Sequence, residues 1–168
     1  MQRQCHCLHQ AWYFQQSANH LLRLVELDLI CRDKPFGALE KDSKRSYYRV
    51  SDPFLRFWYR YVAPYRSRLQ AGQLDSVVAA IKADFPHHVG SVWEDLVRSA
   101  ISLSPIHGHP WGPAQRWWGP GLDRKPLEID AVAENLEGTA LLLASVKWQD
   151  HLSLSTAWAE LRRQVQNF

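Results

Sequence analysis

The chain has 168 residues, with 20 Lys and Arg, 17 Asp and Glu, and a formal net charge of +3. That length can bury one good core or two small ones, so one or two domains are expected. The longest apolar run, residues 140–144, is far too short to span a bilayer, and the polar first ten residues lack a signal-peptide core. These features exclude a membrane-spanning protein and predict a cytoplasmic one without a membrane partner.

Cysteine usage indicates the redox compartment of the protein, and the charge distribution indicates what kind of partner it could bind. Three cysteines, an odd count, give no disulfide framework and fit a reducing compartment. Two of them flank His6, but this spacing is tighter than that of a zinc knuckle and no second pair follows, so a frayed terminus is expected. Residues 23–68 hold 11 Lys and Arg against 6 Asp and Glu. This basic half is a candidate for contact with an anionic partner, and the alternative is a solvated basic surface.

Residues 1–50 predict the latter half of a winged helix. Apolar residues recur at helical spacing over residues 13–27, a short strand follows at 27–32, and a charged loop at 33–45 precedes a strand at 46–50. A winged helix contacts DNA through its last helix and its wing. The basic residues that would meet phosphates are Arg23, Lys34, Lys41, Lys44 and Arg45. The alternative is a remnant that serves only as a packing module.

Residues 51–90 predict a helical linker. Asp52 is placed as an N-cap with Pro53 at the first helical position, and aromatic residues follow at steps of three and four. This aromatic helix, residues 53–65, is predicted either to be buried or to dock a partner, and Pro64 is predicted to kink or end it. A second amphipathic helix is predicted to end at Pro86.

Residues 91–168 predict a sheet flanked by helices. A helix carrying Glu94 comes first, then a Pro- and Gly-rich connection over 104–121. The segment LEIDAVAE at 127–134 alternates, which places Glu128 and Asp130 on one strand face and the apolar residues through Ala131 on the other. A turn at Asn135–Gly138 leads to the strand TALLLASVKW at 139–148, and a last helix is predicted from about residue 155 to 168, with a buried apolar stripe.

An acid on one strand and a lysine on the next suggest metal-assisted phosphodiester chemistry. Carboxylates hold a hard cation, and a lysine orients water or offsets developing charge. The pattern resembles the core hairpin of the PD-(D/E)XK nuclease-like superfamily, with Asp130 as the first acid and Lys147 as the lysine. The acid expected two residues before the lysine is replaced by Ser145. The resemblance gives Glu94 as the glutamate that opens the core, and the alternative for this residue is a surface pair with Arg98 at i+4. Glu128, on the same strand face as Asp130, is the carboxylate that would compensate for Ser145, and bound Mg²⁺ or Mn²⁺ would be the cofactor.

Five ordered motifs make a second resemblance specific. The run YRVSDPFLRFWYRYV at 48–62 is followed by WEDLVR, RWW, EIDAVA and VKW. This order, over residues 21–148, resembles the C-terminal domain of unknown function, DUF234, of archaeal-type AAA+ ATPases. The resemblance implies an ATPase module, then a winged helix, then a nuclease-like domain. It also implies an AAA+ ATPase module as a partner, or self-association through residues 53–65.

The chain departs from that family pattern in two ways. No G-x-x-x-x-G-K-[ST] loop occurs, so neither a bound nucleotide nor ATPase activity is expected. The nuclease-like core at 91–168 lacks its last expected strand, so the chain reads as incomplete at both ends. The predicted fold is α/β (α+β), a partial winged helix followed by a restriction-endonuclease-like three-layer core with a small mixed sheet.

Three functions remain open at this point. The first is a nucleic-acid-binding or regulatory domain with a degenerate nuclease site. The second is a metal-dependent deoxyribonuclease that uses the acids and lysine named above. The third is a protein-docking module for an ATPase partner.

Overall fold

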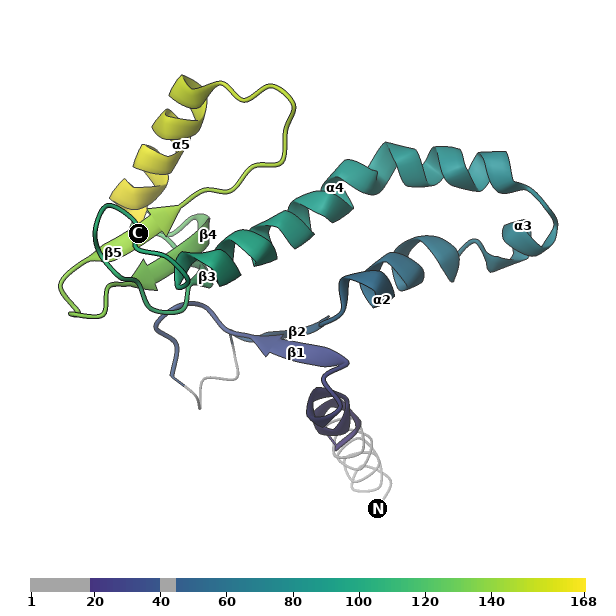
Figure 1. Cartoon of the computed structure of the whole chain (residues 1–168), viewed down its shortest axis with the longest axis horizontal. Helices are drawn as coiled ribbons and strands as arrows, with labels where there is room; N and C mark the ends of the chain where they lie inside the picture. Colours follow the sequence, from purple (N-terminus) through teal and green to yellow (C-terminus); the bar gives the residue numbers. More distant parts are fainter. Residues whose placement is uncertain (1–18, 40–44) are drawn as a thin grey trace, which may run out of the picture. The chain divides into compact units, whose positions relative to one another are not determined.

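The computed structural model describes residues 19–39 and 45–168 (Figure 1). The chain divides into two compact units, Met1–Asp33 with Tyr47–Ala63, and Lys34–Ser46 with Pro64–Phe168. Lys41 and Lys44, and the N-terminal Cys and His residues, lie outside the described residues.

The first unit is a helix followed by a hairpin and a second helical segment. Residues 19–26 are helical, and β1 (Ile30–Asp33) pairs antiparallel with β2 (Tyr47–Val50). The Arg49 guanidinium donates to the Asp33 carboxylate at 2.5 Å, which ties the two strands together. This order of helix, strand, loop and strand follows the predicted one; its relation to a winged helix stays a prediction.

The aromatic helix of the first unit begins and ends where its sequence predicts. In α2 (Pro53–Phe57) the Leu55 amide donates to the Asp52 carboxylate at 2.9 Å, the N-cap bond expected of this residue. The helix continues as a π-helix, η1 (Trp58–Val62), whose last bond runs from the Ala63 amide to the Trp58 carbonyl. Pro64 follows directly, so the predicted helix end is confirmed.

The second unit contains one very long helix. After α3 (Arg66–Gln70), α4 runs from Leu74 to Ile101, 28 residues that include Pro86. The prediction that Pro86 ends a helix is therefore wrong, and His87 and His88 also lie in α4. A proline removes one helical hydrogen bond, at a cost of about 3 kcal/mol, and in a helix of this length the flanking turns stay intact. Residue 90, the predicted domain boundary, lies inside α4.

Three antiparallel strands form the sheet of the second unit. Their order is β3 (Gln115–Pro120), β4 (Pro126–Glu134) and β5 (Leu141–Ala144), with β4 in the centre. An α+β fold is confirmed. The predicted mixed sheet is not found, since both sheets are antiparallel throughout the described ranges. Short hairpin connections join β3 to β4 and β4 to β5, and a hairpin can only make antiparallel neighbours.

The turn between β4 and β5 is built around one buried asparagine. The Asn135 side-chain oxygen accepts from the amides of Thr139 and Ala140, at 2.8 and 2.9 Å, and its side-chain nitrogen donates to the Thr139 hydroxyl. Gly138 adopts a φ of +70°, which a residue with a Cβ rarely takes. The turn predicted at Asn135–Gly138 is therefore confirmed, and it places β5 beside β4.

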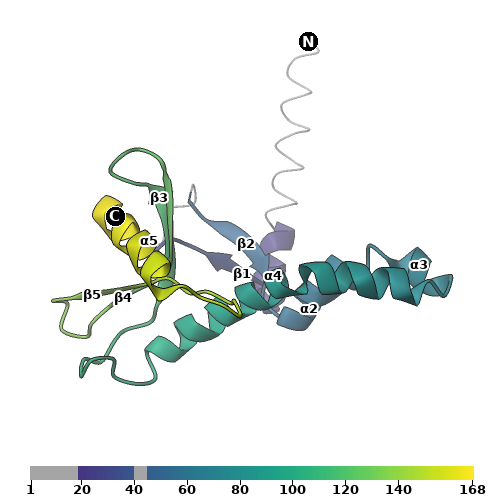
Figure 2. The same cartoon turned by 90° about the horizontal axis from the view of Figure 1, so that it is seen from above.

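Helices cover the central strand. The buried alanines Ala131 and Ala133 pack with Ile101 at the end of α4 and with Trp111 in the loop that follows. The last helix, α5 (Leu154–Asn167), contacts β4 as well, and Figure 2 shows it beside the sheet. At its end the Phe168 ring lies 4.9 Å from that of Trp117 in β3.

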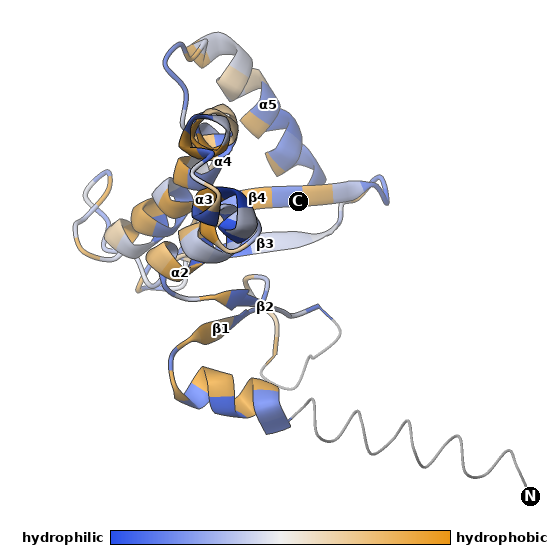
Figure 3. Ribbon diagram, turned by 90° about the vertical axis from the view of Figure 1, so that its right-hand side faces the viewer, coloured by the Kyte–Doolittle hydropathy of each residue, from blue (hydrophilic) through white to orange (hydrophobic). Residues whose placement is uncertain are grey.

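The bounds predicted for α5 are nearly correct, but its predicted burial is wrong. Leu154 is 76% exposed and Trp158 is 61% exposed. Figure 3 shows apolar and polar residues interspersed along the helix. The amphipathic pattern therefore predicts the helix correctly, but the apolar side chains along it are not all buried. Only the C-terminal end of α5 reaches the sheet. Among the described residues, no helix combines the length and apolar character needed to cross a membrane.

Candidate functional site

A cavity of about 480 Å³ opens between α4, the sheet and the segment after β5. It brings together three residues that the sequence singled out, Glu94 from α4, Asp130 from β4 and Lys147 from beyond β5. We call it the acid cavity. The other residues that line it are Pro86, His87, Gly90, Ser91, Arg116, Val146 and Trp148. Residues 53 positions apart in the chain thus share one site.

A β-bulge in β4 aims Asp130 at this cavity. The pairing register shifts between Gln115 and Trp117, so that one residue of β3 faces two residues of β4, Asp130 and Ala131. Such a bulge interrupts the alternation of side chains along the strand. Asp130 lines the acid cavity beside α4, and Ala131 packs against the end of the same helix. The prediction that Ala131 shares a face with Ile129, away from Asp130, is therefore wrong.

The carboxylate of Asp130 is held by the segment that leaves β5. Its Oδ2 accepts from the Val146 amide at 2.8 Å and from the Ser145 hydroxyl at 3.2 Å. The strand β5 ends at Ala144, earlier than predicted, so Ser145 lies just past the paired ladder. The nuclease-like pattern would have a second carboxylate at this position. In its place the neutral Ser145 hydroxyl donates a hydrogen bond to the Asp130 carboxylate.

Arg98, on α4, contacts both the backbone of β4 and the acids of its own helix. Its guanidinium donates to the Asp130 carbonyl at 2.7 Å and to the Asp95 carboxylate at 2.5 Å, and lies 3.7 Å from the Glu94 carboxylate. Glu94 and Arg98 form an i,i+4 ion pair. It is no surface pair, however, because the Arg98 side chain is only 11% exposed. One arginine therefore connects the helix to the backbone of the bulged strand.

The pKa of the Glu94 carboxyl is affected by both neighbouring acids and neighbouring arginines. Burial is the main cause that raises the pKa of its carboxyl above the ordinary value, and the nearby Asp130 carboxylate adds to this. Arg116 and Arg98 act in the opposite direction, and Glu128 raises the pKa slightly further. The ionised form of Glu94 is thus disfavoured in the folded chain, as is typical of carboxyls that line a site.

This shift predicts a pH dependence of stability. Because the folded state binds the Glu94 proton more tightly than the unfolded state, its contribution is present below pH 4.5 and is lost as the pH rises through the raised pKa. We expect Glu94→Gln to become more stable relative to the wild type across this mildly acidic window. Urea unfolding of both proteins at several pH values, with chelator present, measures the difference. A difference that does not change with pH would contradict the shift.

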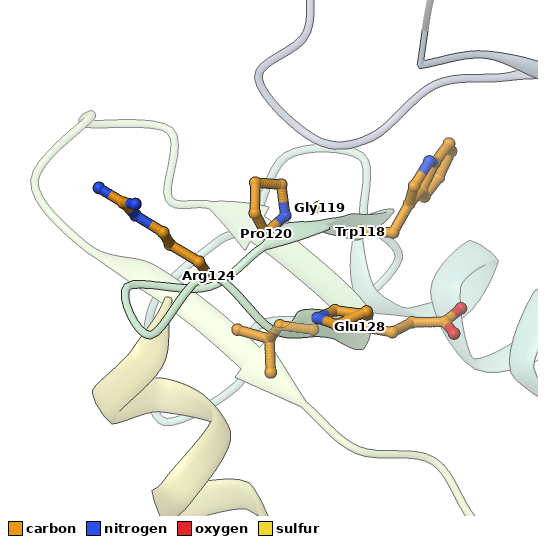
Figure 4. Close-up of a pocket in the computed structure, with 7 residues that line it drawn as sticks. Trp118, Gly119, Pro120, Arg124 and Glu128 are labelled. Carbon is orange, nitrogen blue, oxygen red and sulfur yellow. The ribbon is translucent and has the colours of Figure 1, made fainter.

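Arg116 and Glu128 lie at the border of the acid cavity. The Arg116 guanidinium makes a short ion pair with the Glu128 carboxylate and lies 3.9 Å from that of Glu94. Glu128 itself lines a different cavity, on the β3–β4 hairpin (Figure 4). The sequence singled out Glu128 as a compensating ligand for Ser145, but the structure places its carboxylate on an arginine. Arg116 was not predicted as a site residue, although it stands in the RWW motif before the acidic strand.

Lys147 is exposed and lines the acid cavity, and within the described part of the chain it forms no ion pair. The carboxylates beside it do not complete a metal site. Among residues 19–39 and 45–168, no three His, Cys, Asp or Glu side chains come together closely enough to hold one metal ion. Hard cations in proteins take most of their ligands as oxygens. Glu94 and Asp130 alone supply too few.

The basic residues predicted to meet phosphates are divided between the two units. Arg23 lies in the helix of the first unit, whereas Lys34 and Arg45 belong to the second. Lys41 and Lys44 lie outside the described residues. Their contact with phosphates stays a prediction.

Comparison with known proteins assigns the chain to a family. Residues 58–161 match the model of DUF234, described as archaea bacterial proteins of unknown function. The chain belongs to the DUF234 family. A protein of Methanocaldococcus jannaschii, described as uncharacterized, is 32% identical to this DUF234 chain over 134 residues, which are 78% of the chain and 29% of the relative. The chain thus spans under a third of that relative's length, and no solved structure matches it.

Proposed function

We propose that this DUF234 chain is a nucleic-acid-binding domain built on a nuclease-type site whose hydrolytic chemistry is weakened. One observation carries the proposal. Glu94, Asp130 and Lys147 come from three separate elements and line one cavity. Two acids and a lysine at a sheet edge are the groups that act on phosphodiesters when a cation is present.

The charges around the cavity favour phosphate binding over cation binding. Lys147 and Arg116 present positive charge at its wall. Two arginine guanidinium groups, 3.7 and 3.9 Å from the Glu94 carboxylate, offset its charge. Ser145 adds no charge beside Asp130. A phosphate group therefore meets less repulsion here than three ionised acids would produce.

The binding function is tested with a labelled oligonucleotide at low ionic strength and in a salt series. We expect affinity to fall as salt rises, because each phosphate contact releases counterions. Lys147→Ala should weaken binding and reduce the slope of log K against log salt by about one. Lys82→Ala, which removes an exposed lysine from α4, is the matched control and should change little. Undetectable binding of the wild type at low salt would remove the proposal.

A metal-dependent deoxyribonuclease is the second candidate. The same convergence of Glu94, Asp130 and Lys147 favours it, with Mg²⁺ or Mn²⁺ as the cation. The present donor set argues against strong binding of either ion. Nicking of supercoiled DNA with each ion tests the candidate directly. Activity that Lys147→Ala abolishes would establish it, whereas activity that survives in the variant would come from a contaminant.

The aromatic helix supports a third candidate, docking to an ATPase module or to a second copy. Phe54 is 65% exposed and Trp58 and Tyr59 are also exposed, while Tyr61 is buried. The predicted stripe is thus only partly buried within the chain. Sedimentation velocity of the wild type and of Phe54→Ala distinguishes the cases. A wild type that is monomeric at all concentrations would exclude self-association, and pull-down with an ATPase partner would then be needed to keep docking.

A further inference from the structure

A second cavity, also of about 480 Å³, lies on the β3–β4 hairpin (Figure 4). Trp118 and Pro120 come from β3, Arg124 from the turn, and Leu127 and Glu128 from β4. We call it the hairpin cavity. Figure 4 shows Trp118 and Arg124 at opposite ends with Pro120 between them. The cavity is therefore bounded by an aromatic ring at one end and a cation at the other.

This combination suits a planar ring attached to an anion. Aromatic rings, prolines and aliphatic side chains stack or pack against flat apolar faces. Arg124 is exposed and forms no ion pair within the described residues, so its guanidinium is available to a ligand. Nucleobases stack on aromatic side chains irrespective of their identity, since each has a π-face.

The two cavities adjoin through a single ion pair. Arg116 lines the acid cavity, Glu128 lines the hairpin cavity, and their side chains contact each other. A ligand with a phosphate in the first cavity and an adjacent ring in the second would pass directly over this pair. A polynucleotide strand has that alternation of phosphate and base.

We propose that the hairpin cavity receives an unpaired nucleobase of the strand whose phosphate lies at Lys147, with Trp118 as the stacking surface. The inference rests on the nucleic-acid binding proposed above and adds a substrate class to it. Bases in a duplex are paired and stacked on each other, so they cannot enter such a cavity. The preferred ligand is therefore single-stranded nucleic acid or an unpaired overhang.

The test compares two single-stranded probes of equal length, a DNA of mixed sequence and a chain of abasic sugar–phosphate units. Both carry the same charge, so phosphate contacts are matched. We expect the wild type to bind the base-bearing probe roughly 5- to 150-fold tighter, the range for stacking of one base. Trp118→Leu should lose this preference and Trp118→Tyr should retain most of it. Trp158→Ala, which removes an exposed ring from α5, is the control and should behave as the wild type.

Each outcome separates this inference from the proposed function. Equal binding of both probes by the wild type overturns the stacking site and leaves phosphate binding in place. Binding of neither probe overturns both. Tighter binding of a fully paired duplex than of the single strand also overturns the inference. The comparison of probes on the wild type requires no variant, so the inference stays testable even if Trp118→Leu fails to fold.

Discussion

Arg98→Ala is expected to lower the free energy of unfolding by about 3 kcal/mol, the cost typical of removing one partner from a buried charge network. The variant would leave the Asp130 carbonyl and the Asp95 carboxylate without the guanidinium that they share, at 2.7 and 2.5 Å. The arginine is mostly buried, so water cannot readily replace it. Urea unfolding followed by circular dichroism measures the loss.

Two comparisons make this result specific to the guanidinium. Lys82→Ala removes an exposed cation from the same helix and should change stability by no more than about 0.5 kcal/mol. Arg98→Lys keeps the charge but cannot reach both partners with a planar fork, so an intermediate loss is expected. If Arg98→Ala were as mild as Lys82→Ala, the proposed bracing of the bulged strand by α4 would be wrong.

Ser145→Glu is expected to create a cation site, which residues 19–39 and 45–168 of the natural chain do not form. The Ser145 hydroxyl lies 3.2 Å from the Asp130 carboxylate, so a carboxylate at this position would join Asp130 and Glu94 at one cavity. Three acids in place of two should bind Mn²⁺ at least about tenfold tighter than the wild type does, because ligand charge sets the affinity for hard cations. Isothermal titration calorimetry at neutral pH measures both proteins.

The same variant should behave differently without and with metal. In chelator, the added charge repels the two existing carboxylates and the hydroxyl bond to Asp130 is lost, so the thermal midpoint should fall. Added Mn²⁺ should raise it again, since a ligand that binds only the folded state stabilises it. Ser145→Gln, which has nearly the same shape without the charge, should show no rise. A rise of equal size in Ser145→Gln would mean that the ion binds elsewhere.

Much of the local structure follows from the sequence because it depends on residues close in the chain. The N-cap at Asp52, the turn built by Asn135 and Gly138, and the bounds of β4 and α5 each rest on side chains within a few residues of the element. Such signals need no knowledge of distant partners. The convergence of Asp130 and Lys147 also follows, because one hairpin joins β4 to the segment that carries Lys147.

Other features depend on partners that the sequence does not identify. Nothing near Pro86 indicates that α4 continues past it, since the outcome depends on the stability of the whole helix. The bulge at Asp130 is a property of how β3 pairs with β4 and not of either strand alone. Arg116 becomes a site residue only because β3 lies against β4. Each of these arises from pairing between segments, which periodicity cannot show.

The bulge separates two tasks that one strand performs. Glu128 and the first bulge residue, Asp130, supply charge to the cavities, and the second bulge residue, Ala131, fills the core against α4 together with Ala133. Because the side-chain alternation restarts at the bulge, the charged residues Glu128 and Asp130 and the packed alanines occupy successive parts of the strand. A substitution of Glu128 or Asp130 should therefore change the charge of the cavities more than the packing of the core. Chemistry and architecture can evolve here at different rates.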